Sequence, residues 1–329
     1  MIIYFVIIIF LLIFSSCKNK YLYFFTLLLL IIIGGFRGYD VGTDTTHYLA
    51  LYETYGSVQS KAFLLTEPGW VALNLFVYNY IGDYRAVVVI AQVLILTPIF
   101  LRLWKSTKAP VLGVLFYVLL YYYLNSFNVT RQFVAIAFIF YSMPFLLEGQ
   151  TKKFYLFVLV ACLFHLTSGV CFLMPFLMRL PKLSMPSIVI LLLSSYILGI
   201  LFIPRIISYV PFFGKYMVYV ANAGEASGSF SRLLLNGFYI VLYMYLDKNK
   251  YMKYFFYGII IYNLFAFNPV IGRAGIYFMI SQLFIISNLS LKNKTISLQL
   301  KGIFLIYGLV TFVTLLNANV GEVVPYYFD

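Results

Sequence analysis

Charged residues are scarce in this sequence. Asp, Glu, Lys and Arg make up only 10% of its 329 residues, whereas a soluble domain typically carries about 25%. Cysteine is also rare, and Cys17, Cys162 and Cys171 lack the CxxC-type spacing of a metal site. The first sixteen residues lack the basic start of a signal peptide and fit a first membrane span better. We therefore expect neither a separate soluble domain nor a cysteine metal centre.

Apolar runs of about 20 residues, the length that crosses a bilayer, recur along the whole chain, which is 63% hydrophobic. We predict about twelve spans, near residues 2–16, 22–36, 85–103, 109–126, 132–147, 153–164, 168–180, 185–203, 231–246, 253–267, 274–290 and 299–316. The short pair 153–164 and 168–180 fits one tilted helix or a broken pair, and 69–82 fits a span or a surface helix. The expected fold is all-α, a polytopic transmembrane bundle forming a single membrane domain over residues 1–329.

Lysine and arginine divide between the two sides of this layout. Alternate loops hold fifteen of the 23 basic residues, and thirteen of these are lysine. The positive-inside rule places these loops in the cytoplasm and both termini outside. The other face holds eight basic residues, six of them arginine, and eight of the ten acids. Topology explains the inner lysines but not the outer arginines, whose planar fork suits phosphate. We therefore expect the chemistry outside, in the longer segments near 37–84 and 204–230, and no binding of nucleic acid.

The first outer segment opens with the motif RGYDVGTDTTHY at residues 37–48. Thr43 or Asp44 is a natural N-cap for a following helix. One face of that helix gathers Tyr48, Leu51, Tyr52 and Tyr55. The pattern predicts an interfacial helix with tyrosines among lipid head groups. Asp40 and Asp44 fit two interpretations. They cap helices while Arg37 anchors a span, or they form a polar cluster with a carboxylate as general base and Arg37 holding an anion.

Two more motifs carry titratable side chains. In Thr66-Glu67-Pro68, the proline suits the first turn of a helix with Thr66 or Glu67 as its cap. Glu67 then either interacts favourably with the positive end of the helix dipole or takes part in catalysis. His165 lies in a turn between two short spans, where it fits a base or a donor to diphosphate, or a structural partner of backbone carbonyls. The spacing of these groups is not that of a metal site, and we expect no metal.

Arginine recurs at the outer start of three inward-running spans, as Arg131 beside Gln132, Arg232 and Arg273. A cation in the first turn opposes the helix dipole and costs about 0.3–1 kcal/mol. Repetition of this cost favours a bound anion held jointly by helix N-termini and guanidinium groups. The alternative is snorkelling to the interface, which does not explain arginine in preference to lysine.

Six short motifs run in order along nearly the whole chain. They are Arg37–Tyr48, Glu67-Pro68-Gly69, Thr130-Arg131-Gln132, Phe164-His165-Leu166-Thr167-Ser168, Gly272-Arg273 and Val324-Pro325-Tyr326. In these motifs the chain resembles the EpsG family, the Wzy-like membrane polymerases of bacterial exopolysaccharide and O-antigen synthesis. The family often has two adjacent histidines where this chain has Phe164 and His165.

The resemblance implies a glycosyltransferase at the outer face of the bacterial cytoplasmic membrane. It would transfer a glycan from an undecaprenyl-diphosphate donor to a sugar hydroxyl of a second lipid-linked unit, with a chain-length regulator and a flippase as further candidate partners. The candidate diphosphate- and substrate-binding residues are Arg37, Arg131, Gln132, Arg232, Arg273 and Tyr48. The candidate bases are Asp44, ranked first, then Asp40, Glu67 and His165. No phosphate-cradling glycine loop is present, so no cofactor is expected.

Other functions fit parts of the pattern. A flippase for lipid-linked oligosaccharide would use broken helices near 153–180, but should carry polar residues through the bilayer depth. An O-antigen ligase-type transferase or a sugar acyltransferase would work on the same outer face. A purely structural membrane component leaves the outer arginines unexplained. Outer tyrosines, including those at 121–123, fit either sugar stacking or an interfacial belt.

Overall fold

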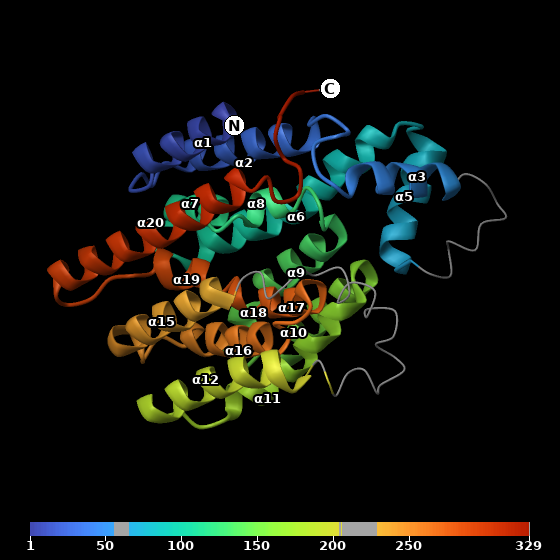
Figure 1. The fold of residues 1–329 in the computed structure, drawn as a ribbon. Helices are drawn as coiled ribbons and strands as arrows, with labels where there is room; N and C mark the ends of the chain where they lie inside the picture. The colour runs from blue at the N-terminus through green and yellow to red at the C-terminus, as the bar shows by residue number, and fades with distance from the viewer. Residues whose placement is uncertain (56–65, 204, 206–228, 329) are drawn as a thin grey trace. The chain divides into compact units, whose positions relative to one another are not determined.

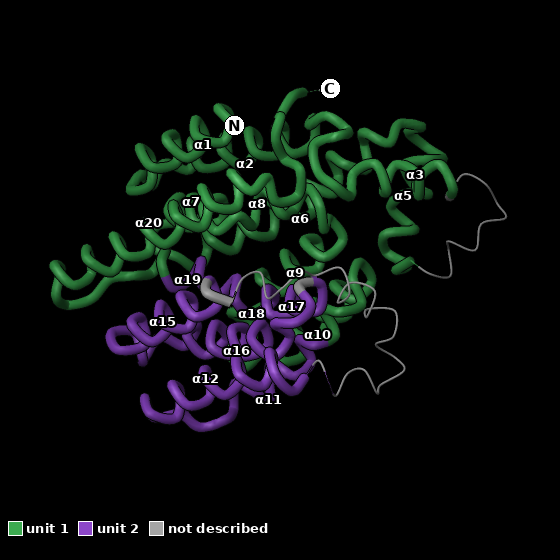
Figure 2. Tube along the Cα trace, viewed as in Figure 1, with its two compact units in different colours: residues 1–169, 286–329 green, residues 170–285 purple. Residues whose placement is uncertain are grey.

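The computed structural model describes residues 1–55, 66–203, 205 and 229–328, and every regular element in these residues is a helix (Figure 1). The prediction of an all-α fold is therefore confirmed. The chain divides into two compact units (Figure 2). Unit 1 comprises residues 1–169 and 286–329, and unit 2 comprises residues 170–285. The prediction of one membrane domain stays a prediction.

Unit 1 contains most of the N-terminal helices and the last one. They are α1 (Ile2–Ile13), α2 (Lys20–Gly35), α3 (Thr45–Tyr55), α5 (Pro68–Tyr80), α6 (Tyr84–Ser106), α7 (Pro110–Leu119), α8 (Tyr122–Asn125), α9 (Thr130–Leu147), α10 (Thr151–Phe164) and α20 (Lys294–Asn317). The Asn19 side chain begins α2 by accepting hydrogen bonds from the N–H groups of Tyr21 and Leu22 at 2.8 and 3.1 Å. Pro68 and Pro110 begin α5 and α7, where a missing N–H needs no partner.

Unit 2 contains shorter and more broken elements. They are the second half of η1 (Leu166–Leu173), then α11 (Met174–Arg179), α12 (Met185–Leu201), α15 (Ser229–Leu246), α16 (Tyr251–Leu264), α17 (Pro269–Gly272), η3 (Arg273–Gly275), α18 (Ile276–Met279) and the start of α19 (Gln282–Ser287). Its core forms where α12, α15 and α16 pack together. The predicted span 274–290 is thus a chain of short helical pieces.

Four described helical segments have the length and composition to cross a membrane: residues 84–106, 130–147, 270–287 and 294–317. Shorter apolar helices cover 2–13, 20–35, 110–119, 166–179, 185–201 and 231–246. This pattern is that of a membrane protein, but the predicted count of about twelve spans is not confirmed.

Local breaks explain part of the difference in span count. The predicted span 109–126 is interrupted at Tyr121, whose backbone is left-handed with φ 64° between α7 and α8. The predicted span 168–180 winds first as the 3-10 helix η1 and then as α11. The segment 69–82 is the 13-residue helix α5, which is too short to span a bilayer.

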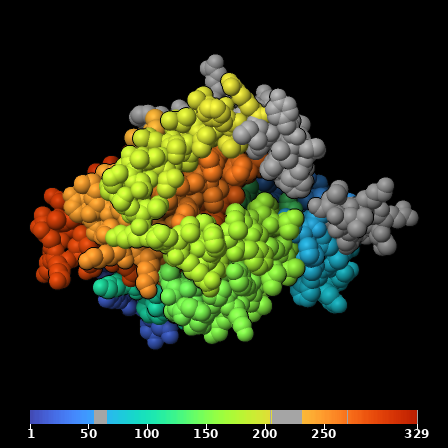
Figure 3. All heavy atoms as spheres, turned by 90° about the horizontal axis from the view of Figure 1, so that it is seen from below, coloured from blue at the N-terminus to red at the C-terminus, as the bar shows by residue number. Residues whose placement is uncertain are grey.

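Exposed apolar side chains lie along α10 on the surface of unit 1. Leu156, Leu159 and Leu163 project into the surroundings, and the green atoms of this part of the chain form a broad face in Figure 3. An apolar surface of this kind is stable only against lipid or another protein. It supports the assignment of α10 to a membrane-embedded segment.

The outer tyrosines do not form the predicted interfacial belt. Tyr48 and Tyr52 of α3 are only 5% and 6% exposed, because they pack with Trp70 between α3 and α5. The three tyrosines at 121–123 are also buried. These tyrosines belong to the core of the protein. The role of Tyr48 in a substrate site stays a prediction.

Candidate functional site

Arg37 fixes the loop between α2 and α3. Its guanidinium donates to the carbonyls of Gly34, Val41 and Phe127, the last two at 3.1 and 3.0 Å. It also lies 4.7 Å from the centre of the Phe127 ring. Burial lowers the pKa of Arg37 to about 10, so the group stays charged at neutral pH. Because carbonyl groups already surround this cation, we leave Arg37 out of the proposed anion site.

The C-terminal segment after α20 lies along the loop 37–45 (Figure 1). The N–H of Gly42 donates to the carbonyl of Glu322 at 3.0 Å, and the N–H of Thr43 donates to the carbonyl of Gly321 at 3.1 Å. The first and last motifs of the sequence thus form one structure. The sequence indicates both motifs but not their pairing, because backbone hydrogen bonds do not depend on residue type.

Asn128 connects this paired structure to α9. Its Oδ1 accepts a hydrogen bond from the Thr43 hydroxyl at 3.0 Å. A side chain at Gly321 would place its Cβ 2.0 Å from Asn128 Nδ2, so the close approach requires glycine. Arg131 follows Asn128 by three residues in the first turn of α9, as predicted. Asn128 therefore sets the position of the turn that carries Arg131.

The start of α5 packs closely against the end of α10. A Cβ at Gly69 would lie 2.8 Å from the carbonyl oxygen of Leu163, a distance that only glycine permits. Glu67 is the N-cap residue of α5, and His165 is the C-cap residue of α10. The glycine of the Glu67-Pro68-Gly69 motif thus lets the two capping side chains meet.

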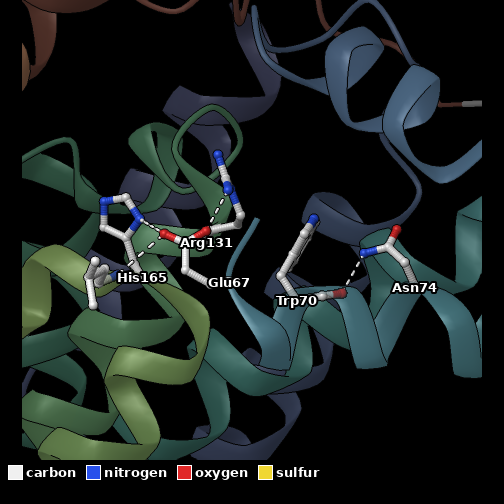
Figure 4. A network of polar contacts seen from close by, with 6 residues as sticks. Glu67, Trp70, Asn74, Arg131 and His165 are labelled. Atoms are coloured by element: carbon white, nitrogen blue, oxygen red, sulfur yellow. Dashed lines mark hydrogen bonds and ion pairs between the residues drawn. The ribbon is translucent and has the colours of Figure 1, made fainter. Parts of the chain in front are cut away.

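Glu67, Arg131 and His165 form a cluster of charged and polar groups (Figure 4). Glu67 Oε2 lies 2.6 Å from Arg131 Nη1, and Glu67 Oε1 lies 3.1 Å from His165 Nδ1. The backbone N–H of Leu166 also donates to Oε1 at 3.3 Å. The side chains are 17%, 24% and 25% exposed in the order Glu67, Arg131, His165. The cluster is thus partly open to solvent or substrate.

The ionisation of Glu67 follows from these contacts. Burial by itself raises the pKa of the carboxyl, but the hydrogen bond from His165 and the charge of Arg131 outweigh that effect. The net pKa is lowered from 4.5 to about 2. Glu67 is therefore a carboxylate at neutral pH. Its side chain makes no capping hydrogen bond to α5 and contacts Arg131 and His165 instead.

Aromatic side chains back the cluster on the side of α3 and α5. The Arg131 guanidinium lies 5.6 Å from the centre of the Tyr48 ring, and that ring lies 5.2 Å from Trp70. Asn74, one turn beyond Trp70, donates to the Trp70 carbonyl at 2.8 Å (Figure 4). Tyr48 thus lies between Arg131 and the α3–α5 core. The Arg131 cation is stabilised by facing the Tyr48 ring.

The two aspartates of the first motif lie in the same unit. Asp44 immediately precedes α3, and its backbone carbonyl accepts from the N–H of Tyr48 at 2.9 Å. Burial is the main cause that raises the pKa of the Tyr48 hydroxyl, and the negative charge of Asp44 raises it further. Asp40 is exposed and accepts a hydrogen bond from the Tyr327 hydroxyl at 3.0 Å. Gln132 is buried in the first turn of α9.

Unit 2 carries the other predicted arginines. Arg232 lies in the first turn of α15, only 4% exposed, with its guanidinium 3.8 Å from the centre of the Tyr262 ring. It also donates to the Tyr262 carbonyl. Arg273 begins η3, after α17, and lies near the start of the apolar helical segment 270–287. The predicted outer segment 204–230 lies almost wholly outside the described residues, as does 56–65 within the segment 37–84.

The chemistry available to the cluster of unit 1 is proton transfer. A neutral His165 that donates from Nδ1 to the Glu67 carboxylate leaves Nε2 as an acceptor for a substrate proton. Glu67 then stabilises the imidazolium that forms, as a carboxylate does for histidine in other acid–base sites. Arg131 adds a positive charge beside this dyad, suited to an anionic substrate group.

Comparison with known proteins gives one result. The model of the EpsG family matches residues 20–328, nearly the whole chain. No curated protein and no solved structure matches the chain. The match includes every motif in which the sequence resembles this family.

Proposed function

Because this chain belongs to the EpsG family, we propose that it is a polymerase of bacterial exopolysaccharide. It transfers a glycan from an undecaprenyl-diphosphate donor to a sugar hydroxyl of a second lipid-linked unit. The reaction occurs at the outer face of the cytoplasmic membrane. The observation that carries the proposal is the cluster of Glu67, Arg131 and His165, in which three separate family-like motifs meet through ionic contacts.

His165 is the general base of the proposed reaction. Its Nε2 takes the proton of the acceptor hydroxyl while the hydroxyl oxygen attacks the anomeric carbon of the donor. The bond from that carbon to the phosphate oxygen breaks, and the lipid diphosphate leaves. Glu67 orients the imidazole and holds its positive charge. Since Glu67 already accepts from Arg131 and His165, it is a weaker choice for the base.

Asp44 is the alternative base. It lies beside Tyr48, which itself contacts Arg131, so it belongs to the same neighbourhood. The contact from His165 to a carboxylate, in place of the backbone carbonyls of the structural interpretation, favours His165. The leaving diphosphate needs positive charge. In unit 1 the proposed source is Arg131, followed in the chain by Gln132, and the roles predicted for Arg232 and Arg273 of unit 2 stay predictions.

The test is polymerisation by the purified full-length protein. A synthetic polyprenyl-diphosphate oligosaccharide should yield a ladder of lengthened products. His165→Gln should slow lengthening by about 100-fold or more, the usual contribution of general base catalysis. The matched control is His47→Gln, because His47 is the other histidine of the chain and is exposed on α3. It should polymerise at the wild-type rate.

The other outcomes separate the alternatives. Full activity of His165→Gln together with loss of activity in Asp44→Asn would make Asp44 the base. Movement of lipid-linked units between leaflets without lengthening would make the protein a flippase. Transfer only to an acceptor that lacks a lipid-linked repeat unit would indicate a ligase.

A further inference from the structure

A buried polar network joins three helices of unit 2. The Ser195 hydroxyl of α12 donates to the carbonyl of Leu192 at 2.9 Å. One N–H of Asn263 Nδ2, on α16, is shared between the Leu192 carbonyl at 3.3 Å and Ser195 Oγ at 3.1 Å. The same Nδ2 donates to Asn236 Oδ1 of α15 at 3.0 Å. All three polar side chains are at most 4% exposed.

The network fixes which way each amide points. The Asn263 amide faces the Leu192 carbonyl and the Ser195 hydroxyl, whose hydrogen is already donated to Leu192. Both oxygens can therefore only accept, so the amide group that faces them is the NH₂. That NH₂ donates to Asn236, so the atom of Asn236 that meets it is the oxygen. The NH₂ of Asn236 is therefore directed elsewhere. Among the described residues, neither Asn236 Nδ2 nor Asn263 Oδ1 has a hydrogen-bond partner.

Arg232 lies one helical turn before Asn236 on α15. Arg232 contacts Tyr262, and Asn236 contacts the adjacent residue Asn263, so both side chains leave α15 toward the end of α16. No described carboxylate pairs with Arg232, although it is buried. A buried charge without a described carboxylate partner and a buried donor without an acceptor each carry a free-energy cost that a bound anion reduces.

We propose that Arg232 and Asn236 bind the phosphate of a glycosyl diphosphate, with Asn263 accepting from a hydroxyl of the attached sugar. This inference rests on the proposed function and extends it, because it assigns Asn236 and Asn263 to substrate binding. A cation, an N–H donor and a carbonyl acceptor match a phosphate that carries a hydroxyl-bearing sugar. The N-terminus of the 18-residue helix α15 adds its dipole to the same anion.

The sharpest variant is Asn236→Asp. It keeps an oxygen to accept from Asn263 Nδ2 but replaces the proposed phosphate donor with a second, repelling oxygen. Full-length protein in phosphatidylcholine nanodiscs is titrated with undecaprenyl diphosphate and with undecaprenol, which lacks the diphosphate. The variant should bind undecaprenyl diphosphate at least tenfold more weakly than wild type and undecaprenol equally well.

The matched control is Asn249→Asp in the same unit. Asn249 uses its Oδ1 to accept from the N–H of Tyr251 at 3.0 Å, a bond that aspartate retains. It adds the same negative charge at a distant loop and should leave diphosphate binding unchanged. Equal binding by Asn236→Asp and wild type would overturn the inference. Equal wild-type binding of undecaprenyl diphosphate and undecaprenol would overturn the proposed donor itself.

Two further measurements complete the test. Inorganic pyrophosphate should not compete with the lipid at similar concentrations, and effective competition would assign the site to a soluble phosphate compound instead. A photoreactive polyprenyl diphosphate, irradiated with wild-type protein, should label peptides of α15 or α16. Labelling of neither helix would contradict the site even where the Asn236 variant fails to fold.

Discussion

Arg131 in unit 1 and Arg232 in unit 2 have the same place in a helix but opposite surroundings. Each lies in the first turn, where its charge opposes the helix dipole. Arg131 is partly exposed and pairs with Glu67 at 2.6 Å. Arg232 is buried over Tyr262, and no described carboxylate pairs with it. Arg131 is therefore paired with a carboxylate of the protein, while Arg232 has only the carbonyl and ring of Tyr262 among its described contacts.

The largest expected effect concerns the paired arginine. Glu67→Gln removes the charge that holds both Arg131 and His165, so kcat for polymerisation should fall by about 100- to 1,000-fold, within the usual range for acid–base machinery. Initial rates with the lipid-linked oligosaccharide measure this. Glu53→Gln on the exposed side of α3 is the matched control and should retain the wild-type rate. A Glu67→Gln enzyme within threefold of wild type would remove the cluster from catalysis.

The lowered pKa of Glu67 predicts that the stability of the protein depends on pH. Its folded-state pKa is lowered from 4.5 to about 2, so its contribution is complete above pH 4.5 and is lost as pH falls through about 2. The full contribution is at most about 3 kcal/mol. Thermal unfolding at pH 6 and pH 3 should show a larger loss in wild type than in Glu67→Gln. Equal losses would mean that the ion pair does not stabilise the fold.

The cluster of unit 1 could be predicted in its residues but not in its contacts. Glu67, Arg131 and His165 were all candidates, because each residue type in its motif suits anion binding or proton transfer. Their meeting depends on the close approach at Gly69, which places two helix ends side by side. Glycine in a sequence does not tell which neighbour approaches it. By sequence Asp44 ranks above His165 because it is a carboxylate near interfacial tyrosines, an argument that does not include the contact between His165 and Glu67.

Arg37 shows the limit of reading charge from a sequence. Its motif and its position at the end of a span are typical of an anion-binding group, like those of Arg131. Yet backbone carbonyls of three residues surround it, and these groups carry no sequence signal. The all-helical fold was easier to predict, because hydrophobic runs decide it. Breaks such as Tyr121 depend on tertiary packing, and hydrophobic runs do not reveal them.

The loop held by Arg37 gives the next prediction. Gly42 has φ 110°, and a Cβ there would lie 3.0 Å from the Phe127 carbonyl oxygen. Gly42→Ala should therefore lower stability by about 1–3 kcal/mol, visible as a lower Tm. Gly302→Ala in α20 is the matched control, since a Cβ there meets nothing within 4 Å. The control should be neutral or slightly stabilising. A Gly42→Ala protein with the wild-type Tm would contradict the loop geometry.

The smallest effect tests the comparison of the two arginines directly. Arg232→Lys keeps the charge but loses the planar fork over Tyr262, so KM for the lipid diphosphate should rise about tenfold, or about 1.4 kcal/mol. Arg131→Lys keeps its ion pair with Glu67 and should change KM by less than about threefold, because an ion pair tolerates lysine better than a bidentate phosphate contact does. Equal KM changes in the two variants would mean that pairing inside the protein does not decide which arginine binds the donor. A larger change in Arg131→Lys would assign the diphosphate to Arg131 instead of Arg232.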